Sequence, residues 1–266
     1  MTGRVETLAL RGRVLGLLVI RDLKVRYVGS VLGYLWTVLE PLMMAGVYFV
    51  VFQIIIGRDV GEEPYIVFLL AAMLPWQWAN GVIHEASKAL TGEAKLVRSA
   101  GLPRQIWVLR VVGSKFLEYM FALPILAAFI IVMPDARHVS WHVIIDYPLA
   151  ILIQATLILG IALALAPLSV LYRDMIRIVR VVTRLLFYFS PIIYSASIIQ
   201  DRMKGLYEFF AYNPFVGIFE LYRRPIFPDA FLGWQPVLIS AGVAIVFLGI
   251  GMWVFRRLEG TVLKEI

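Results

Sequence analysis

The chain has 266 residues, of which 61% are hydrophobic and 16% are charged, and its formal net charge is +7. Soluble domains are about 45–50% apolar and about 25% charged, so this composition excludes an ordinary soluble domain and indicates a polytopic membrane protein. Lysine and arginine accumulate in cytoplasmic loops of such proteins, so the positive charge does not call for a nucleic-acid partner and none is expected. The absence of cysteine excludes disulfides, thiolate metal sites and cysteine nucleophiles.

The first segment, residues 1–27, predicts an amphipathic helix. Apolar residues recur at helical spacing from Leu8 onward, and arginines and a lysine lie among them. This pattern is typical of a helix in the cytoplasmic membrane interface, with its apolar face in lipid and its cations near headgroups. The alternative is a positively charged lead-in that only sets the topology. No cleavable signal peptide is expected, because the apolar run at 14–20 is short and charged residues follow at once.

Six apolar segments are read as membrane spans, which need about 20 mostly apolar residues each. They are residues 31–56, 65–83, 116–133, 147–171, 185–199 and 237–255. Eighteen of the 25 lysines and arginines flank these segments on one side, and six flank them on the other. Because cations accumulate on the cytoplasmic side, the sequence predicts that both termini are cytoplasmic.

The first span contains an acid followed by a helix breaker, Glu40 and Pro41. Proline cannot donate a backbone hydrogen bond, so a kink is expected there. Lipid rejects a charge at mid-membrane, so Glu40 is predicted to face protein, water or a conduit, or to be neutral. Gly29 and Gly33 form a GxxxG pattern at the start of the span, which favours either close approach of helices or a local packing role.

Residues 85–104 form a polar segment between the second and third spans that is longer than a simple connection needs. It predicts a short helix near 92–100 that ends at Gly101 and Pro103. A helix of mixed charge at the cytoplasmic face is a docking surface for a soluble partner, and a solvated loop is the alternative. Further along, Lys115 and Glu118 are three residues apart and are predicted to pair on one helix face.

Two more segments lie outside the spans. Residues 172–180 carry Arg173, Arg177 and Arg180 on one helical face, which is typical of headgroup anchors. Residues 200–236 are dense in aromatic side chains but are interrupted by prolines, so they are too apolar for a free loop and too broken for a span. Short re-entrant or interfacial helices are predicted there, and a belt of interfacial aromatics is the alternative reading for each residue alone.

The motifs of several enzyme classes are missing from the sequence. No GxxxxGK[ST] motif occurs, so the chain is not expected to hydrolyse ATP by itself. His84-Glu85 begins like HExxH, but Lys88 stands where the second histidine is required, so no zinc site is predicted. No aspartate-rich cluster is present to hold Mg²⁺ on a diphosphate. These absences weaken the interpretation of the chain as a membrane enzyme, and neither a metal nor a cofactor is expected on this chain itself.

Five stretches, in order over most of the chain, resemble the permease subunits of bacterial polysaccharide-export ABC transporters. These are type-2 ABC permeases, and they include O-antigen and teichoic-acid exporters. The stretches are KVRYVGSVLGYLWTVLEPLMMAGVYFVVF at 24–52, MLPWQWANGVI at 73–83, KLVRSAGLPRQI at 95–106, LYRDMIRIVRVVTRLLFYFSPIIYSASII at 171–199 and YNPFVGIFELYR at 212–223. The family often has an aromatic residue before the proline of the third stretch, whereas this chain has Leu102 before Pro103.

The resemblance implies a single transmembrane domain over residues 1–266, present as a homodimer above two copies of a separate nucleotide-binding ATPase that holds ATP and Mg²⁺. It implies export of a lipid-linked polysaccharide, whose lipid carries a diphosphate, across the bacterial inner membrane. In these terms residues 1–27 form an interface helix, residues 85–104 hold the coupling segment and residues 200–236 form an outer gate.

Candidate site residues follow from this assignment. Coupling to the ATPase is expected at Gly92, Glu93, Lys95, Arg98 and Arg104. Aromatic faces stack on sugars, and repeated weak sites suit the movement of a polymer. The candidates for such a conduit are Tyr34, Trp36, Glu40, Tyr48, Phe49 and Phe52. Lipid-facing aromatics and, for Glu40, a structural hydrogen bond are the alternatives.

The remaining candidates lie at the two membrane faces. The outer gate is expected at Tyr212, Asn213, Pro214, Phe215, Glu220 and Arg223. The lipid headgroup is expected at Arg21, Lys24 and Arg26, for which topology and anchoring to anionic lipid are the alternative.

Two other functions stay open from the sequence. A stand-alone flippase of lipid-linked sugars would favour internal repeats and paired intramembrane charges. A membrane-embedded transferase would need an acidic metal-binding cluster. Neither set of features is found in the sequence. The sugar composition, the polymer length and the choice between O-antigen and teichoic acid are likewise open.

Overall fold

The computed structural model describes residues 2–57, 61–99, 102–133, 139–202, 205 and 210–265. Every regular element within these ranges is a helix. The helices are α1 (Thr2–Tyr27), η1 (Gly33–Leu35), α2 (Trp36–Phe49), η2 (Val50–Ile55), α3 (Tyr65–Ala86), α4 (Ala94–Ser99), α5 (Gln105–Val132), α6 (Val143–Leu171), α7 (Met175–Phe189), α8 (Ala196–Arg202), α10 (Pro214–Arg223), η4 (Pro228–Ala230) and α11 (Trp234–Glu265). The predicted all-helical class is confirmed.

Five of the described helical segments are long and apolar enough to cross a membrane. They are Gly33–Ile55, Tyr65–Ala86, Gln105–Val132, Val143–Leu171 and Trp234–Val262. They contain the first, second, third, fourth and sixth predicted spans almost entirely, so the polytopic membrane fold is confirmed. Helix α5 begins eleven residues before the predicted third span, because its polar first turns pack within the protein and include the buried Arg110.

The fifth predicted span, residues 185–199, is wrong as a continuous helix. Helix α7 begins ten residues earlier and ends at Phe189, and α8 follows only after an irregular stretch at 190–195. The cause is local. Ser190 precedes Pro191 and has extended backbone angles (φ −102°, ψ 148°), since a proline disfavours the helical conformation of the residue before it.

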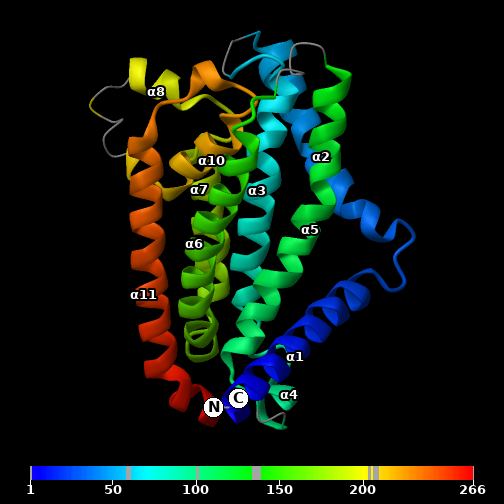
Figure 1. Cartoon of the computed structure of the whole chain (residues 1–266), viewed down its shortest axis with the longest axis vertical. Helices are drawn as coiled ribbons and strands as arrows, with labels where there is room; N and C mark the ends of the chain where they lie inside the picture. Colours follow the sequence, from blue (N-terminus) through cyan, green and yellow to red (C-terminus); the bar gives the residue numbers. More distant parts are fainter. Residues whose placement is uncertain are drawn as a thin grey trace.

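Figure 1 shows how the elements are arranged. The start of α1, helix α4 and the end of α11 lie at one end of the bundle, called here the terminal end, and α8 lies at the opposite end. Helix α1 runs obliquely across the terminal end and buries Val19 and Leu23, whereas Leu10 and Leu17 remain exposed. Helix α3 is almost wholly buried, and α2, α5, α6 and α10 pack around it.

Helices α6 and α11 form the most extensive helix pair, and two glycines allow their close approach. A Cβ atom on Gly251 would lie 2.1 Å from the carbonyl oxygen of Gly160. A Cβ atom on Gly160 would lie 2.5 Å from the backbone nitrogen of Leu248. Small residues at such crossings let two membrane helices make backbone contact.

The GxxxG pattern at Gly29 and Gly33 has a different role from helix packing. Both glycines have positive φ (80° and 49°), and no atom lies within 4 Å of a Cβ built on either. They form the turn between α1 and α2, where the left-handed backbone region favours glycine. The expectation of close helix approach at this site is therefore corrected.

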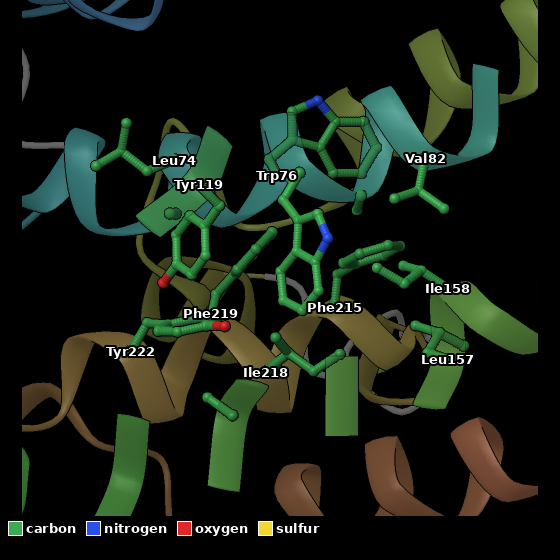
Figure 2. Close-up of a cluster of buried hydrophobic side chains, with 14 of the residues drawn as sticks. Leu74, Trp76, Val82, Tyr119, Leu157, Ile158, Phe215, Ile218, Phe219 and Tyr222 are labelled. Atoms are coloured by element: carbon green, nitrogen blue, oxygen red, sulfur yellow. The ribbon is translucent and has the colours of Figure 1, made fainter. Parts of the chain in front are cut away.

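The core between α3 and α10 is aromatic. Figure 2 shows Trp76 beside Phe215 and Tyr119 beside Tyr222. The ring centroids lie 5.2 Å apart in the first pair and 6.1 Å apart in the second, and both pairs are edge-to-face, a favourable geometry for aromatic rings. This core fixes α10 against the spans.

Candidate functional site

Two polar cavities lie on either side of α2. The first, called the inner cavity, has a volume of about 410 Å³ and lies between the end of α1 and helices α2, α3 and α5. The second, called the α2–α7 groove, has a volume of about 380 Å³ and lies between α2, α3 and α7. Glu40, Gln77 and Asn80 line both, so the two cavities meet at these side chains.

Glu40 is an exposed carboxylate on the wall of both cavities. Its position agrees with the expectation that an acid within a span faces protein, water or a conduit. Pro41, the next residue, is buried, and α2 continues through it.

The other conduit candidates separate into two groups. Trp36 lines the inner cavity and Tyr48 lines the groove, where its ring stacks on Phe187 of α7 at 5.7 Å. The remaining three line neither cavity. Tyr34 packs on Tyr27 and Phe121, Phe49 stacks on Tyr65, and Phe52 lies beside Tyr48.

The groove wall on α7 was not anticipated as part of a site. Arg180 and Arg184 line it, together with Thr183, Phe187 and Tyr188. The sequence carried a usable signal, because these residues recur every three or four positions and therefore share one helical face. Of the other arginines predicted as headgroup anchors, Arg177 is exposed and lies 4.0 Å from Asp174.

A cluster of ion pairs joins α1 to the bundle at the terminal end. It holds Arg21, Arg26, Arg110 and Lys115 with Asp22, Glu85, Glu93 and Glu118. Arg26 donates to Glu118 and, at 2.5 Å, to Glu85. Lys115 lies 3.0 Å from Glu85 and 2.8 Å from Glu118, which confirms the predicted pairing of Lys115 with Glu118. We call this set the α1 ion cluster.

Arg110 and Glu93 extend the α1 ion cluster to the polar segment 85–104, where coupling to an ATPase is predicted. Arg110 contacts Asp22 at 3.0 Å and Glu93 at 3.1 Å, and Arg21 also donates to Glu93. Burial raises the pKa of Asp22 above its ordinary value, against the lowering effect of Arg110 and Arg21. The residues of the segment around Glu93 are thus tied to α1 through charge.

The headgroup and coupling candidates are placed as follows. Arg21 and Arg26 are paired with acids of the protein, whereas Lys24 is exposed. Gly92 is exposed, and Arg104 lies 2.7 Å from Glu259 of α11. The side chains of Lys95 and Arg98 lie outside the described residues. The predicted helix near 92–100 is present as α4, which is shorter, at Ala94–Ser99.

At the opposite end of the bundle, side chains complete the backbone hydrogen bonds where α7 stops. Asn213 accepts a hydrogen bond from the backbone N–H of Phe215 at 3.0 Å and so caps α10, and Pro214 occupies the first helical position. The same side chain donates to the carbonyl of Phe189 and the hydroxyl of Ser190, both at 3.0 Å. The Asn-Pro step therefore starts α10 and closes the end of α7 at once.

Arg223 completes the same connection from the other end of α10. It is buried, and its guanidinium donates to the carbonyls of Pro191, Ile192 and Phe68. It also lies 3.5 Å from the ring centroid of Phe68. The Tyr65 hydroxyl donates to the carbonyl of Ile193 at 2.7 Å. Irregular backbone at membrane depth requires partners of this kind.

Other gate candidates have separate positions. Glu220 is buried and accepts from the backbone N–H of Leu232 at 3.0 Å. Phe215 lies in the core against Trp76, and Tyr212 is exposed. The structure therefore brings Asn213, Pro214 and Arg223 together at the end of α7, and it places the other gate candidates around them.

Comparison with known proteins gives the same family along most of the chain. Residues 13–227 match the family model described as ABC-2 type transporter. The chain is 28% identical over 239 residues to the "O-antigen export system permease protein RfbA" of Klebsiella pneumoniae, covering 90% of this chain and 89% of that protein. It is 29% identical over 239 residues to the protein of the same description from Myxococcus xanthus, covering 90% of both. It is 21% identical over 251 residues to the "Polysialic acid transport protein KpsM" of Escherichia coli, covering 93% of this chain and 94% of that protein.

Proposed function

The chain belongs to the ABC-2 type transporter family, and from that premise we propose that it is the permease subunit of an ATP-driven exporter of lipid-linked, O-antigen-like polysaccharide. Two relatives named as O-antigen export permeases cover about nine-tenths of the chain, and a third is named for polysialic acid transport. The protein is a multi-pass component of the bacterial inner membrane. Both termini are cytoplasmic, and the cation asymmetry of the sequence supports this orientation.

The observation that carries the proposal is the α2–α7 groove. Arg180, Arg184 and Glu40 place charge on a wall that lies between apolar spans, where charged side chains mark substrate paths. Exposed apolar residues flank the groove on α2 and α7, among them Val47 and Val181. A second copy of the chain that covers these faces turns two grooves into one conduit at a homodimer interface.

ATP hydrolysis belongs to two copies of a separate nucleotide-binding subunit, because this chain has no phosphate-binding loop. Those subunits hold ATP and Mg²⁺ and dock on the segment 85–104. Their closure displaces this segment. The α1 ion cluster passes the displacement to α1 and α5, and the Arg104–Glu259 pair passes it to α11. The two protomers then separate along the groove, and the gate around α10 admits the polymer to the outer side.

Co-purification with the ATPase subunit, followed by ATP turnover with and without polymer, tests the proposal. We expect a stable complex whose turnover rises with polymer, and reduced export by Glu40→Leu. Met43→Leu is the matched control, since Met43 is exposed on the same helix and lines neither cavity. ATP hydrolysis by the purified chain alone would contradict the assignment of ATP hydrolysis to a separate subunit. Undiminished export by Glu40→Leu with intact dimers would remove Glu40 from the path.

A further inference from the structure

The inner cavity is distinct from the groove and has the features of a small-molecule site. Its volume of about 410 Å³ lies within the range of roughly 300–1,000 Å³ that is usual for small-ligand pockets. It is set between α2 and the α3–α5 pair, and only the edge at Glu40, Gln77 and Asn80 is shared with the groove. A conduit along α2 and α7 makes no use of its other walls.

Flat aromatic surfaces form part of the lining. Trp78 and Tyr119 both line the cavity, and their rings stack at 5.4 Å with planes only 10° apart. Trp36 and Tyr27 line other walls. Trp78 and Tyr119 cover each other's facing surfaces, whereas Trp36 is 45% exposed and can offer a ring face to the C–H groups of a ligand.

Several hydrogen-bonding groups in the lining have no protein partner. Trp78 is only 3% exposed, and its indole Nε1 is buried without a hydrogen bond. Within the described part of the chain, the side-chain amides of Gln77 and Asn80 make no hydrogen bond to another residue. Gln77 and Asn80 are only partly buried and line the cavity, so their amides are available to a polar occupant, whereas the Trp78 nitrogen is enclosed within the wall.

The charges of the lining argue against an anion. The two cations, Arg26 and Lys115, are each paired with both Glu85 and Glu118. Glu40 and Glu118 also line the cavity, so its two basic side chains are matched by two acidic ones. A phosphate would have to displace a carboxylate from each cation. A neutral ligand with many hydroxyl groups can instead donate to the carboxylates and accept from the amides.

We propose that the inner cavity is a saccharide-binding site for one or two neutral sugar units of the polymer. This inference rests on the proposed function and adds to it a site beside the conduit. The sugar stacks on the face of Trp36 and bonds to Gln77 and Asn80. Arg26, Lys115 and Glu118 belong to both the cavity wall and the α1 ion cluster, so a bound sugar contacts the side chains that connect α1 with the coupling segment.

The test uses the permease–ATPase complex in lipid nanodiscs and saturation-transfer NMR. The probes are neutral mono- and disaccharides of common hexoses, with inorganic pyrophosphate as the anionic probe. We expect saturable binding of at least one saccharide. Trp36→Ala should weaken it about tenfold or more, because a stacking face is lost, and Trp36→Phe should retain it. Trp253→Ala, an exposed tryptophan of α11, is the matched control and should bind as the parent does.

The possible results test the saccharide site and the exporter proposal separately. Tighter binding of pyrophosphate than of any saccharide would overturn the assignment, as would saccharide binding that Trp36→Ala leaves unchanged. Saccharide binding without polymer-dependent ATP turnover would keep the site and overturn the exporter proposal. Polymer-dependent turnover without saccharide binding would keep the exporter and overturn the site.

Discussion

Arg223 places a guanidinium among backbone carbonyls that the end of α7 leaves without helical partners. Each of the carbonyls from Tyr188 to Ile193 has a defined acceptor role. The donors are the Tyr194 hydroxyl, the Asn213 amide, the Ile192 backbone N–H, Arg223 and the Tyr65 hydroxyl. Arg223 serves two of these carbonyls as well as that of Phe68. The irregular backbone after α7 therefore has its carbonyls hydrogen-bonded, as buried backbone groups require.

We expect Arg223→Gln to destabilise the protein strongly. Hydrogen bonds to charged groups contribute about 1.5–3 kcal/mol each, so the free energy of unfolding should fall by about 3 kcal/mol or more. Thermal unfolding of the detergent-purified chain measures this. Arg256→Gln, at an exposed position of α11, is the control and should unfold as the parent does. Equal melting temperatures for both variants would show that the carbonyls find other partners.

Local spacing predicted some contacts of single residues and could not predict others. The Lys115–Glu118 pair follows from a separation of three positions on one helix. Arg26 pairs with Glu85 and Glu118, which are 59 and 92 positions away along the chain. Such partners depend on how helices pack in space, and no local pattern encodes this. For that reason Arg21 and Arg26 were assigned to a lipid headgroup rather than to the α1 ion cluster.

At the scale of elements, the crossing of α6 and α11 depends on glycine. We expect Gly251→Ala to cost about 1–3 kcal/mol of stability, because its Cβ atom would meet the Gly160 carbonyl and overpacked contacts cost about this much. Gly249→Ala is the matched control on the same helix, since no atom lies within 4 Å of its Cβ position. Alanine favours a helix by about 1 kcal/mol over glycine, so this control should be neutral or stabilising. Chemical denaturation of both variants measures whether each substitution lowers or raises the free energy of unfolding. A Gly251→Ala protein as stable as the parent would rule out the tight crossing.

Arg26 and Lys24, two cations near the end of α1, are expected to differ in their effect on ATP turnover. Arg26→Gln should lower the polymer-dependent part of ATP turnover, because it removes the ion pairs of Arg26 with Glu85 of α3 and Glu118 of α5. Lys24→Gln, two positions earlier and exposed, should leave turnover unchanged. The measurement is ATP hydrolysis by the permease–ATPase complex with and without polymer. Equal losses in both variants would instead favour contact of the whole cationic face with lipid headgroups.

Element boundaries were predictable where long apolar runs decide them, as in α3, α6 and α11. The fifth span was not, because its sequence remains apolar through Ser190 and Pro191. Pro191 was a local signal for the stop, but the partners of the freed carbonyls, Asn213 and Arg223, come from a distant segment that no local pattern reveals. The aromatic segment 200–236 was correctly read as containing short helices, since its prolines set limits on their length.

At the scale of the whole molecule, the exposed faces of α2 and α7 predict where two copies meet. The natural chain has no cysteine, so a thiol-reactive cross-linker reacts only with the cysteines that are introduced. We expect Met44→Cys combined with Val181→Cys to form a covalent dimer with a short bis-maleimide reagent in native membranes, read on a denaturing gel. Leu152→Cys combined with Val246→Cys, on exposed faces of α6 and α11, is the control and should remain monomeric. A dimer from the control pair alone would place the interface on the other side of the bundle.

The sequence was sufficient for the polytopic fold and the family, because composition and long apolar runs act over the whole chain. The two cavities could not be predicted from the sequence. The inner cavity draws residues from α1, α2, α3 and α5, and the groove draws residues from α2, α3 and α7. Some lining residues, among them Trp36, Glu40 and Tyr48, were predicted singly, but the sequence did not show that they border two separate cavities.

Helix α7 has a consequence for the bilayer around the protein. Its 15 residues extend for about 22 Å, whereas the hydrocarbon core of a membrane is about 30 Å thick. The interface between two copies that is proposed along α7 is therefore shorter than the bilayer, and a thin bilayer matches it at lower cost. We expect export by the reconstituted complex to fall as the acyl chains of the host phosphatidylcholine are lengthened, while α3 and α6 remain matched. Export that is indifferent to chain length would show that the irregular segment after Phe189 and the gate helices fill the remaining depth completely.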